Sequence, residues 1–172
     1  MAIILLQTND ITKNTIIGGN VDIDRLLPAV KACQETMIRK LLGIPLYTKM
    51  TNDYLAGNGS AGFTGLYLEL YNDYIKPMLI HGSSDIFLRS GAYLVSNNGI
   101  TKSKTPDADS ISKEEVDYLA QASRGLYRDY ERDYRDWIKV NGPSIPEYSM
   151  TIKTSDRIVN VGGWVLPRVR RC

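Results

Sequence analysis

The sequence predicts a mainly α fold, a helical bundle of about four to five helices with a small β component. Three observations predict it. Apolar residues recur at helical spacing over most of the chain, Gly and Pro interrupt that spacing at intervals, and the two ends carry short strand-like runs. With 172 residues, 43% of them apolar and 23% charged, the chain fits one globular domain that buries a core without disulfides or metals.

The apolar run at residues 2–6 predicts an N-terminal β-strand, which a polar loop follows. A first helix is expected from Asp22 or Asp24, because acids suit a helix N-terminus. Gly43 and Pro45 end it. Its buried face is a set of apolar residues at helical spacing: Leu26, Val30, Cys33, Met37 and Leu41.

A second, short helix is expected over 46–56, followed by a glycine-rich loop over 57–62. A third helical stretch starts near Phe63. Pro77 must end or kink it, because proline has no amide hydrogen to donate. Helix then resumes over 78–95.

Asn98-Gly99 is a tight-turn signal that predicts a short hairpin, and residues 102–110 predict an exposed loop. Ser112 and Glu115 form a capping-box pattern that opens the last and longest helix. That helix keeps one apolar face as far as Asn141, where Gly and Pro follow.

Beyond Pro143 the pattern becomes extended, and apolar runs on either side of Gly162-Gly163 predict a β-hairpin. An isolated hairpin is marginally stable in water, so this arm is expected to pack on the helices or on a neighbouring chain. The sequence thus divides into a helical domain with an N-terminal strand, 1–143, and an extended C-terminal arm, 144–172.

Composition excludes several classes of protein. Lys and Arg total 21 against 19 for Asp and Glu, and this near balance argues against a general nucleic-acid or membrane binder. The 11 tyrosines suit surfaces that become buried against partners while keeping hydrogen bonds. The two cysteines, Cys33 and Cys172, form no disulfide framework, and the apolar start is too short for a signal peptide. Synthesis in a reducing cytoplasm and no membrane association are expected.

The sequence lacks a constellation of catalytic or metal-binding residues. His81 is its only histidine, and a hydrolase built on His81 and Ser83 is a weak alternative to a polar residue at a helix bend. The spacing of Gly57, Gly59 and Gly62 has no preceding strand, so a flexible loop is favoured over a dinucleotide site. Asp107 and Asp109 lack a third ligand. We expect no enzyme activity, no metal and no cofactor.

The segment from Arg124 to Trp137 interleaves charged residues with aromatic ones. One interpretation is a helix face for protein contacts, with aromatic anchors and Arg side chains. The other is a solvated helix with ion pairs such as Glu131–Arg135 and Arg132–Asp136. Both hold if they concern different faces. The candidate interface residues are Tyr127, Tyr130, Tyr134, Trp137 and, in the arm, Trp164.

The arm is basic near its end. Arg168, Arg170 and Arg171 are candidates for contact with DNA or with a partner chain, and a solubilising terminus is the other interpretation.

The order of these features resembles a known family. Leu41-Leu42-Gly43-Ile44-Pro45-Leu46-Tyr47 joins the first two helices, a Tyr-rich helix with Tyr67, Tyr71 and Tyr74 follows, and Tyr127, Tyr130 and Trp137 lie on the final helix. This order is similar to that of the head-to-tail connector (adaptor, or head-completion) proteins of tailed bacteriophages, especially the ring proteins of crAss-like phages. The resemblance covers residues 20 to 148 and leaves the arm unmatched.

The resemblance implies a structural virion protein at the portal vertex, or neck, made in the host cytoplasm. Its subunits would form a homo-oligomeric ring, typically a dodecamer, below the portal protein. That ring would continue the DNA channel, with non-specific contact to packaged DNA, and would bind further connector or tail proteins. Each subunit would use a heterologous interface, in which one patch meets a different patch of its neighbour. The main alternative is a small helical nucleic-acid-binding or regulatory module that uses the basic C-terminal tail.

Overall fold

The computed structural model describes residues 3–18, 21–91, 93–96, 99–102 and 112–148. Its elements run in the order α1 (Thr8–Asn14), α2 (Ile23–Cys33), the π-helix η1 (Gln34–Ile38), α3 (Arg39–Leu42), α4 (Ile44–Ala56), the 3-10 helix η2 (Ser60–Gly62), α5 (Leu66–Glu69), the π-helix η3 (Leu70–Ile75), α6 (Lys76–Gly91), β1 (Tyr93–Ser96), β2 (Gly99–Lys102), α7 (Lys113–Asn141) and η4 (Gly142–Ser144). The predicted mainly α fold is confirmed.

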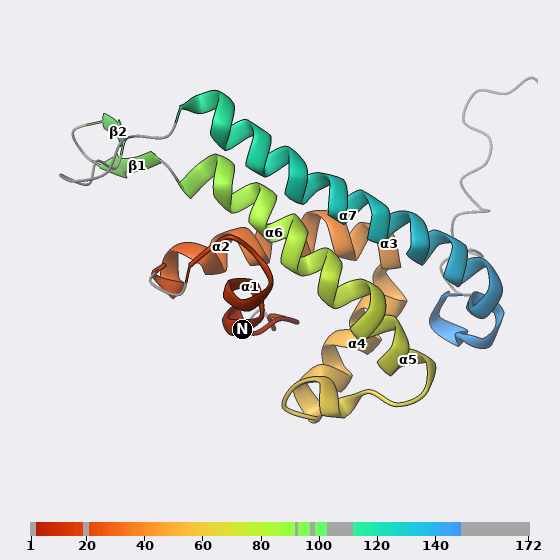
Figure 1. Cartoon of the computed structure of the whole chain (residues 1–172). Coiled ribbons are helices and arrows are strands. Elements are labelled where there is room, and N and C mark those ends of the chain that lie inside the picture. The colour runs from red at the N-terminus through yellow and green to blue at the C-terminus, as the bar shows by residue number, and fades with distance from the viewer. Residues whose placement is uncertain (1–2, 19–20, 92, 97–98, 103–111, 149–172) are drawn as a thin grey trace, which may run out of the picture.

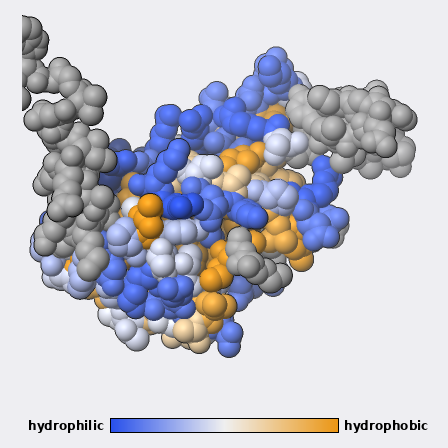
Figure 2. Space-filling view, turned by 180° about the vertical axis from the view of Figure 1, so that it is seen from behind, coloured by the Kyte–Doolittle hydropathy of each residue, from blue (hydrophilic) through white to orange (hydrophobic). Residues whose placement is uncertain are grey.

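The long helices α6 and α7 run side by side and antiparallel, and they organise the molecule (Figure 1). Helix α2 packs on α6, and α4 and α5 lie at the opposite end of the bundle (Figure 1). One core cluster joins all these layers, from Leu5 near the start to Ile145 after α7. The reverse face of the molecule shows hydrophobic residues among hydrophilic ones (Figure 2).

The first predicted helix forms as a continuous helical segment made of α2, η1 and α3. Asp22 caps it, because its side chain accepts a hydrogen bond from the amide of Asp24. Gly43 ends it at a φ of 76°, a left-handed conformation that glycine adopts without strain. These local signals therefore act as the sequence predicts.

The predicted N-terminal strand is wrong for the residues that the structure describes. Residues 3–6 form no strand, although Leu5 and Leu6 are buried. Side chains take the place of a neighbouring strand. Gln34 Oε1 accepts from the Leu5 amide at 2.8 Å, Gln34 Nε2 donates to the Ile3 carbonyl at 2.7 Å, and the Tyr71 hydroxyl donates to the Leu5 carbonyl at 2.8 Å.

Helix α1 was not predicted from the sequence, because it is a polar segment, although its Ile11 is fully buried. An end or a kink was predicted at Pro77, but the helix does not end there, since it continues from η3 into α6. A π-helix shifts the hydrogen-bond register of a helix by one residue. The π-helix η3 ends two residues before Pro77, the residue that has no amide hydrogen to donate.

Strands β1 and β2 pair antiparallel with Ser96 opposite Gly99, on either side of the predicted turn. The helix predicted over 78–95 therefore ends earlier, at Gly91. Packing continues past the predicted domain boundary at 143, because Ile145 is fully buried and the Tyr67 hydroxyl donates to Glu147 at 2.6 Å. The C-terminal hairpin lies outside the described residues. Neither part of the predicted β component, the N-terminal strand nor this hairpin, thus has support in the described structure.

A charged two-sided surface on the last helix

Helix α7 is the most exposed long element of the bundle, and its sequence determines where it begins and which face is buried. Ser112 caps it as predicted: the Ser112 hydroxyl accepts from the Glu115 amide at 3.2 Å, and the Glu115 carboxylate accepts from the Ser112 amide at 2.8 Å. The buried stripe recurs at helical spacing and consists of Ala120, Tyr127, Tyr134, Trp137 and Ile138.

This burial corrects the predicted interface residues. Tyr127, Tyr134 and Trp137 retain only 5%, 1% and 9% of their surface, so they belong to the core of the subunit. Tyr130 is half-buried and stacks on His81, with ring centroids 5.8 Å apart and planes at 9°. An aromatic stripe at helical spacing is compatible with a core or an interface, and here tertiary packing makes it core. Trp164, Arg168, Arg170 and Arg171 lie outside the described residues.

The exposed borders of α7 carry opposite charges. At about 100° per residue, Arg124, Arg128 and Arg135 fall on one flank, and Asp129, Asp133 and Asp136 fall toward the other. Each flank then meets a different neighbour in the bundle. The first faces η1 and α3, and the second faces α5 and η3.

The first flank borders a hollow of about 320 Å³, which we call the basic groove. Its lining comes from η1, α3 and α7: Thr36, Met37, Lys40, Leu41, Arg124, Tyr127, Arg128, Glu131 and Arg135. Arg135 pairs with Glu131 at 2.6 Å, as the sequence predicts. Lys40, Arg124 and Arg128 make no ion pair within the described parts of the chain. The groove therefore carries an excess of positive charge over an apolar floor.

A second hollow of about 240 Å³ adjoins this groove, since Leu41 and Arg135 line both. Tyr134 and Tyr148 also line it. The Tyr134 hydroxyl is buried and has no hydrogen-bond partner among the described residues. Burial raises the pKa of Tyr134, so its hydroxyl stays protonated and can donate.

The opposite side of α7 carries what we call the acidic flank, formed by Glu69, Asp73 and Asp133. All three are exposed, and their charges add to burial in raising the pKa of Tyr74, which lies among them. Glu69 also accepts a hydrogen bond from Trp137 Nε1 at 2.6 Å, which links this flank to the core. Asp73 and Asp133 have no ion pair within the described ranges.

The predicted pair Arg132–Asp136 does not form. Arg132 pairs instead with Asp129 at 2.9 Å, and Asp136 pairs with Lys139 at 2.7 Å, both at i,i+3 spacing. These exposed pairs contribute little to stability. They do neutralise two of the acids on α7, whereas Asp133 has no salt-bridge partner among the described residues.

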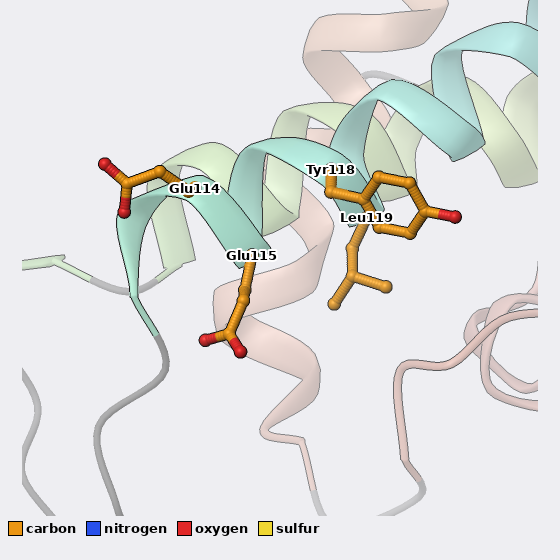
Figure 3. Close-up of a pocket in the computed structure, with 4 residues that line it drawn as sticks. All are labelled: Glu114, Glu115, Tyr118 and Leu119. Atoms are coloured by element: carbon orange, nitrogen blue, oxygen red, sulfur yellow. The ribbon is translucent and has the colours of Figure 1, made fainter.

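A larger hollow, of about 480 Å³, lies at the N-terminal end of α7 and is lined by Glu114, Glu115, Tyr118 and Leu119 (Figure 3). It is open, and Tyr118 is 73% exposed. The carboxylates of Glu114 and Glu115 point in different directions (Figure 3). They therefore do not form the facing pair that acid/base chemistry requires.

The residues considered as catalytic candidates do not come together in one site. Ser83 is fully buried, and its hydroxyl donates to the carbonyls of Leu79 and Ile80 at 2.5 and 3.1 Å. His81 and Ser83 are two positions apart on α6, so they do not face each other. Asp107 and Asp109 lie outside the described residues, and the described ranges contain no group of three potential metal ligands. No described helix is long and apolar enough to cross a membrane.

Sequence reasoning placed Arg124, Arg128 and Asp133 on α7 but missed the two-sided surface. Lys40, Glu69 and Asp73 complete it from segments distant in the sequence, and no local pattern indicates that they adjoin α7. A helical projection of α7 was the signal available, because it separates the cations from the acids.

Comparison with known proteins gives one finding about the family. A model of a family of unknown function, DUF6712, matches residues 38–158. The match spans the chain from the end of η1 through α7, and it includes most of the basic groove and the acidic flank. No curated protein and no solved structure matches the chain.

Proposed function

The chain belongs to the DUF6712 family, and we propose that this member is a structural virion protein that forms a ring below the portal of a tailed phage. The ring would join the capsid vertex to the tail and continue the DNA channel. Its partners would be further copies of itself, the portal protein, and connector or tail proteins, with no cofactor and no catalytic role.

The observation that carries the proposal is the pair of unlike charged surfaces on the two sides of α7. A ring requires a heterologous interface, in which one patch of a subunit meets a different patch of the next. A single subunit with a basic groove on one side and an acidic flank on the other has two patches of that kind. The resemblance in helix order supplies the location of the ring in the virion.

The test is the native mass of the purified protein, alone and mixed with the portal ring of the same phage, measured by light scattering. We expect a ring-sized species in at least one sample, with the portal raising its abundance. Electron microscopy of that species would then give its symmetry. A protein that stays monomeric with the portal present would overturn the proposal.

The basic groove also favours a second candidate, a helical module that binds nucleic acid through Lys40, Arg124 and Arg128, cations without an ion pair among the described residues. This candidate predicts tight binding of DNA by the monomer, with an affinity that falls steeply as salt rises. Removal of Arg168, Arg170 and Arg171 should then weaken binding further. A monomer that ignores the portal but binds DNA in this way would place this candidate first.

A further inference from the structure

We propose that the basic groove of one subunit receives the acidic flank of a second copy of this chain. The inference rests on the proposed ring and names its interface.

The charge of the groove favours a partner surface that is rich in carboxylates. Lys40, Arg124 and Arg128 supply charge that no described acid neutralises, and Met37 and Leu41 supply an apolar floor. Cations over an apolar floor favour a partner surface that brings carboxylates together with apolar groups.

The C-terminal arm of the same chain does not fit this groove by charge. Residues 149–172 contain Lys153, Arg157, Arg168, Arg170 and Arg171 with the single acid Asp156. Like charges repel when an interface brings them together, so this arm would be repelled.

The acidic flank of a second copy has the required chemistry. Glu69, Asp73 and Asp133 are exposed, they gather around Tyr74, and none of the three has a salt bridge among the described residues. Tyr74 adds a half-buried ring at the centre of the acids, which suits the apolar floor of the groove. The charges and the apolar parts of the two patches therefore match.

The helix itself places the two patches on opposite sides. Arg124 and Asp133 are nine positions apart on α7, which at about 100° per residue puts them half a turn from each other. A subunit that offers its groove on one side and its flank on the other can bind a neighbour at each, with the same contact repeated. Such head-to-tail contacts close into a ring when the rotation between subunits permits.

Charge reversal on each side tests the pairing. The groove variant is Arg124→Glu with Arg128→Glu, and the flank variant is Asp73→Lys with Asp133→Lys; all four side chains are exposed, so the monomer should fold. Each variant alone should need a concentration higher by about tenfold or more to associate. A mixture of the two variants should associate as the wild type does, because an acidic groove then meets a basic flank.

A matched control is Lys13→Glu with Lys31→Glu, which changes the net charge as the groove variant does but at exposed positions outside both patches. It should leave association unchanged.

The outcomes separate this inference from the proposed function. A ring that forms with the portal and ignores both charge reversals would overturn the pairing and keep the virion role. Association that is lost in each variant and restored in the mixture, in a protein that does not bind the portal, would keep the pairing and overturn the virion role. Loss in each variant without restoration in the mixture would overturn the pairing.

Discussion

Gly82 lies where three helices approach one another, with α2 and α7 both packed on α6. A Cβ atom at position 82 would lie 2.6 Å from Cys33 Sγ and 3.1 Å from Tyr127 Cδ2, closer than packed atoms allow. Burial, with the charge of Asp85, also raises the pKa of the Cys33 thiol to about 12, so this cysteine acts as a small apolar core residue.

We expect Gly82→Ala to lower the free energy of unfolding by about 1–3 kcal/mol, because the new methyl group must displace core atoms. Gly125→Ala on α7 is the control, since nothing lies within 4 Å of the added carbon. That change should raise stability by about 0.5–1 kcal/mol through helix propensity. Urea unfolding of both variants checks the opposite signs, and equal effects would contradict the close approach at Gly82.

The single histidine gives a pH dependence of its own. Burial lowers the pKa of His81 from its usual 6.5, so the folded protein favours the neutral ring that stacks on Tyr130. Below pH 6.5 the unfolded chain binds this proton more readily than the folded one. The stability that the neutral ring contributes is therefore complete above pH 6.5. It is lost as the pH falls through the lowered pKa of His81 in the folded protein.

Urea unfolding should show lower stability at about pH 5.5 than at about pH 7.5. The ordinary pKa of His lies within this range, whereas those of Asp and Glu lie below it. His81→Gln should be less sensitive to this change of pH than the wild type, because no other histidine titrates there. An equal loss of stability in both proteins would assign the pH dependence to other groups.

At the scale of elements, α7 depends on the cap at its N-terminus. Ser112 and Glu115 satisfy each other's amide hydrogens at the exposed end of a 29-residue helix. We expect Ser112→Ala to cost about 1 kcal/mol of unfolding free energy, because it leaves an amide of the first turn without an acceptor. Ser112→Thr should retain most of the stability, since its hydroxyl can accept the same bond. Equal losses in the two variants would indicate that the cap contributes nothing.

At the scale of the whole molecule, the two charged sides of α7 exist because different segments pack against it. The π-helix η1 and α3 bring Lys40 to one side, and α5 and η3 bring Glu69 and Asp73 to the other. The core that holds these segments in place includes residues from both ends of the described chain, Leu5 and Ile145 among them. Changes in this core should therefore alter the groove and the flank together, while reversal of exposed charges should alter assembly alone.

The local features of this protein can be predicted from its sequence alone. Helical spacing, the Asp22 and Ser112 caps and the stop at Gly43 are encoded by neighbouring residues, and the structure confirms them. The ion pair Glu131–Arg135 likewise follows from spacing along one helix.

What those features face depends on the tertiary structure. It buried Tyr127, Tyr134 and Trp137, which a helical stripe alone cannot distinguish from an interface. In the folded protein, the apolar residues 3–6 form no strand, and the Gln34 side chain holds their backbone by hydrogen bonds. The tertiary structure also joined Lys40 to Arg124 and Glu69 to Trp137 across large sequence distances. The physical reason is that burial and long-range hydrogen bonds depend on which surfaces meet, and local sequence specifies only what each surface contains.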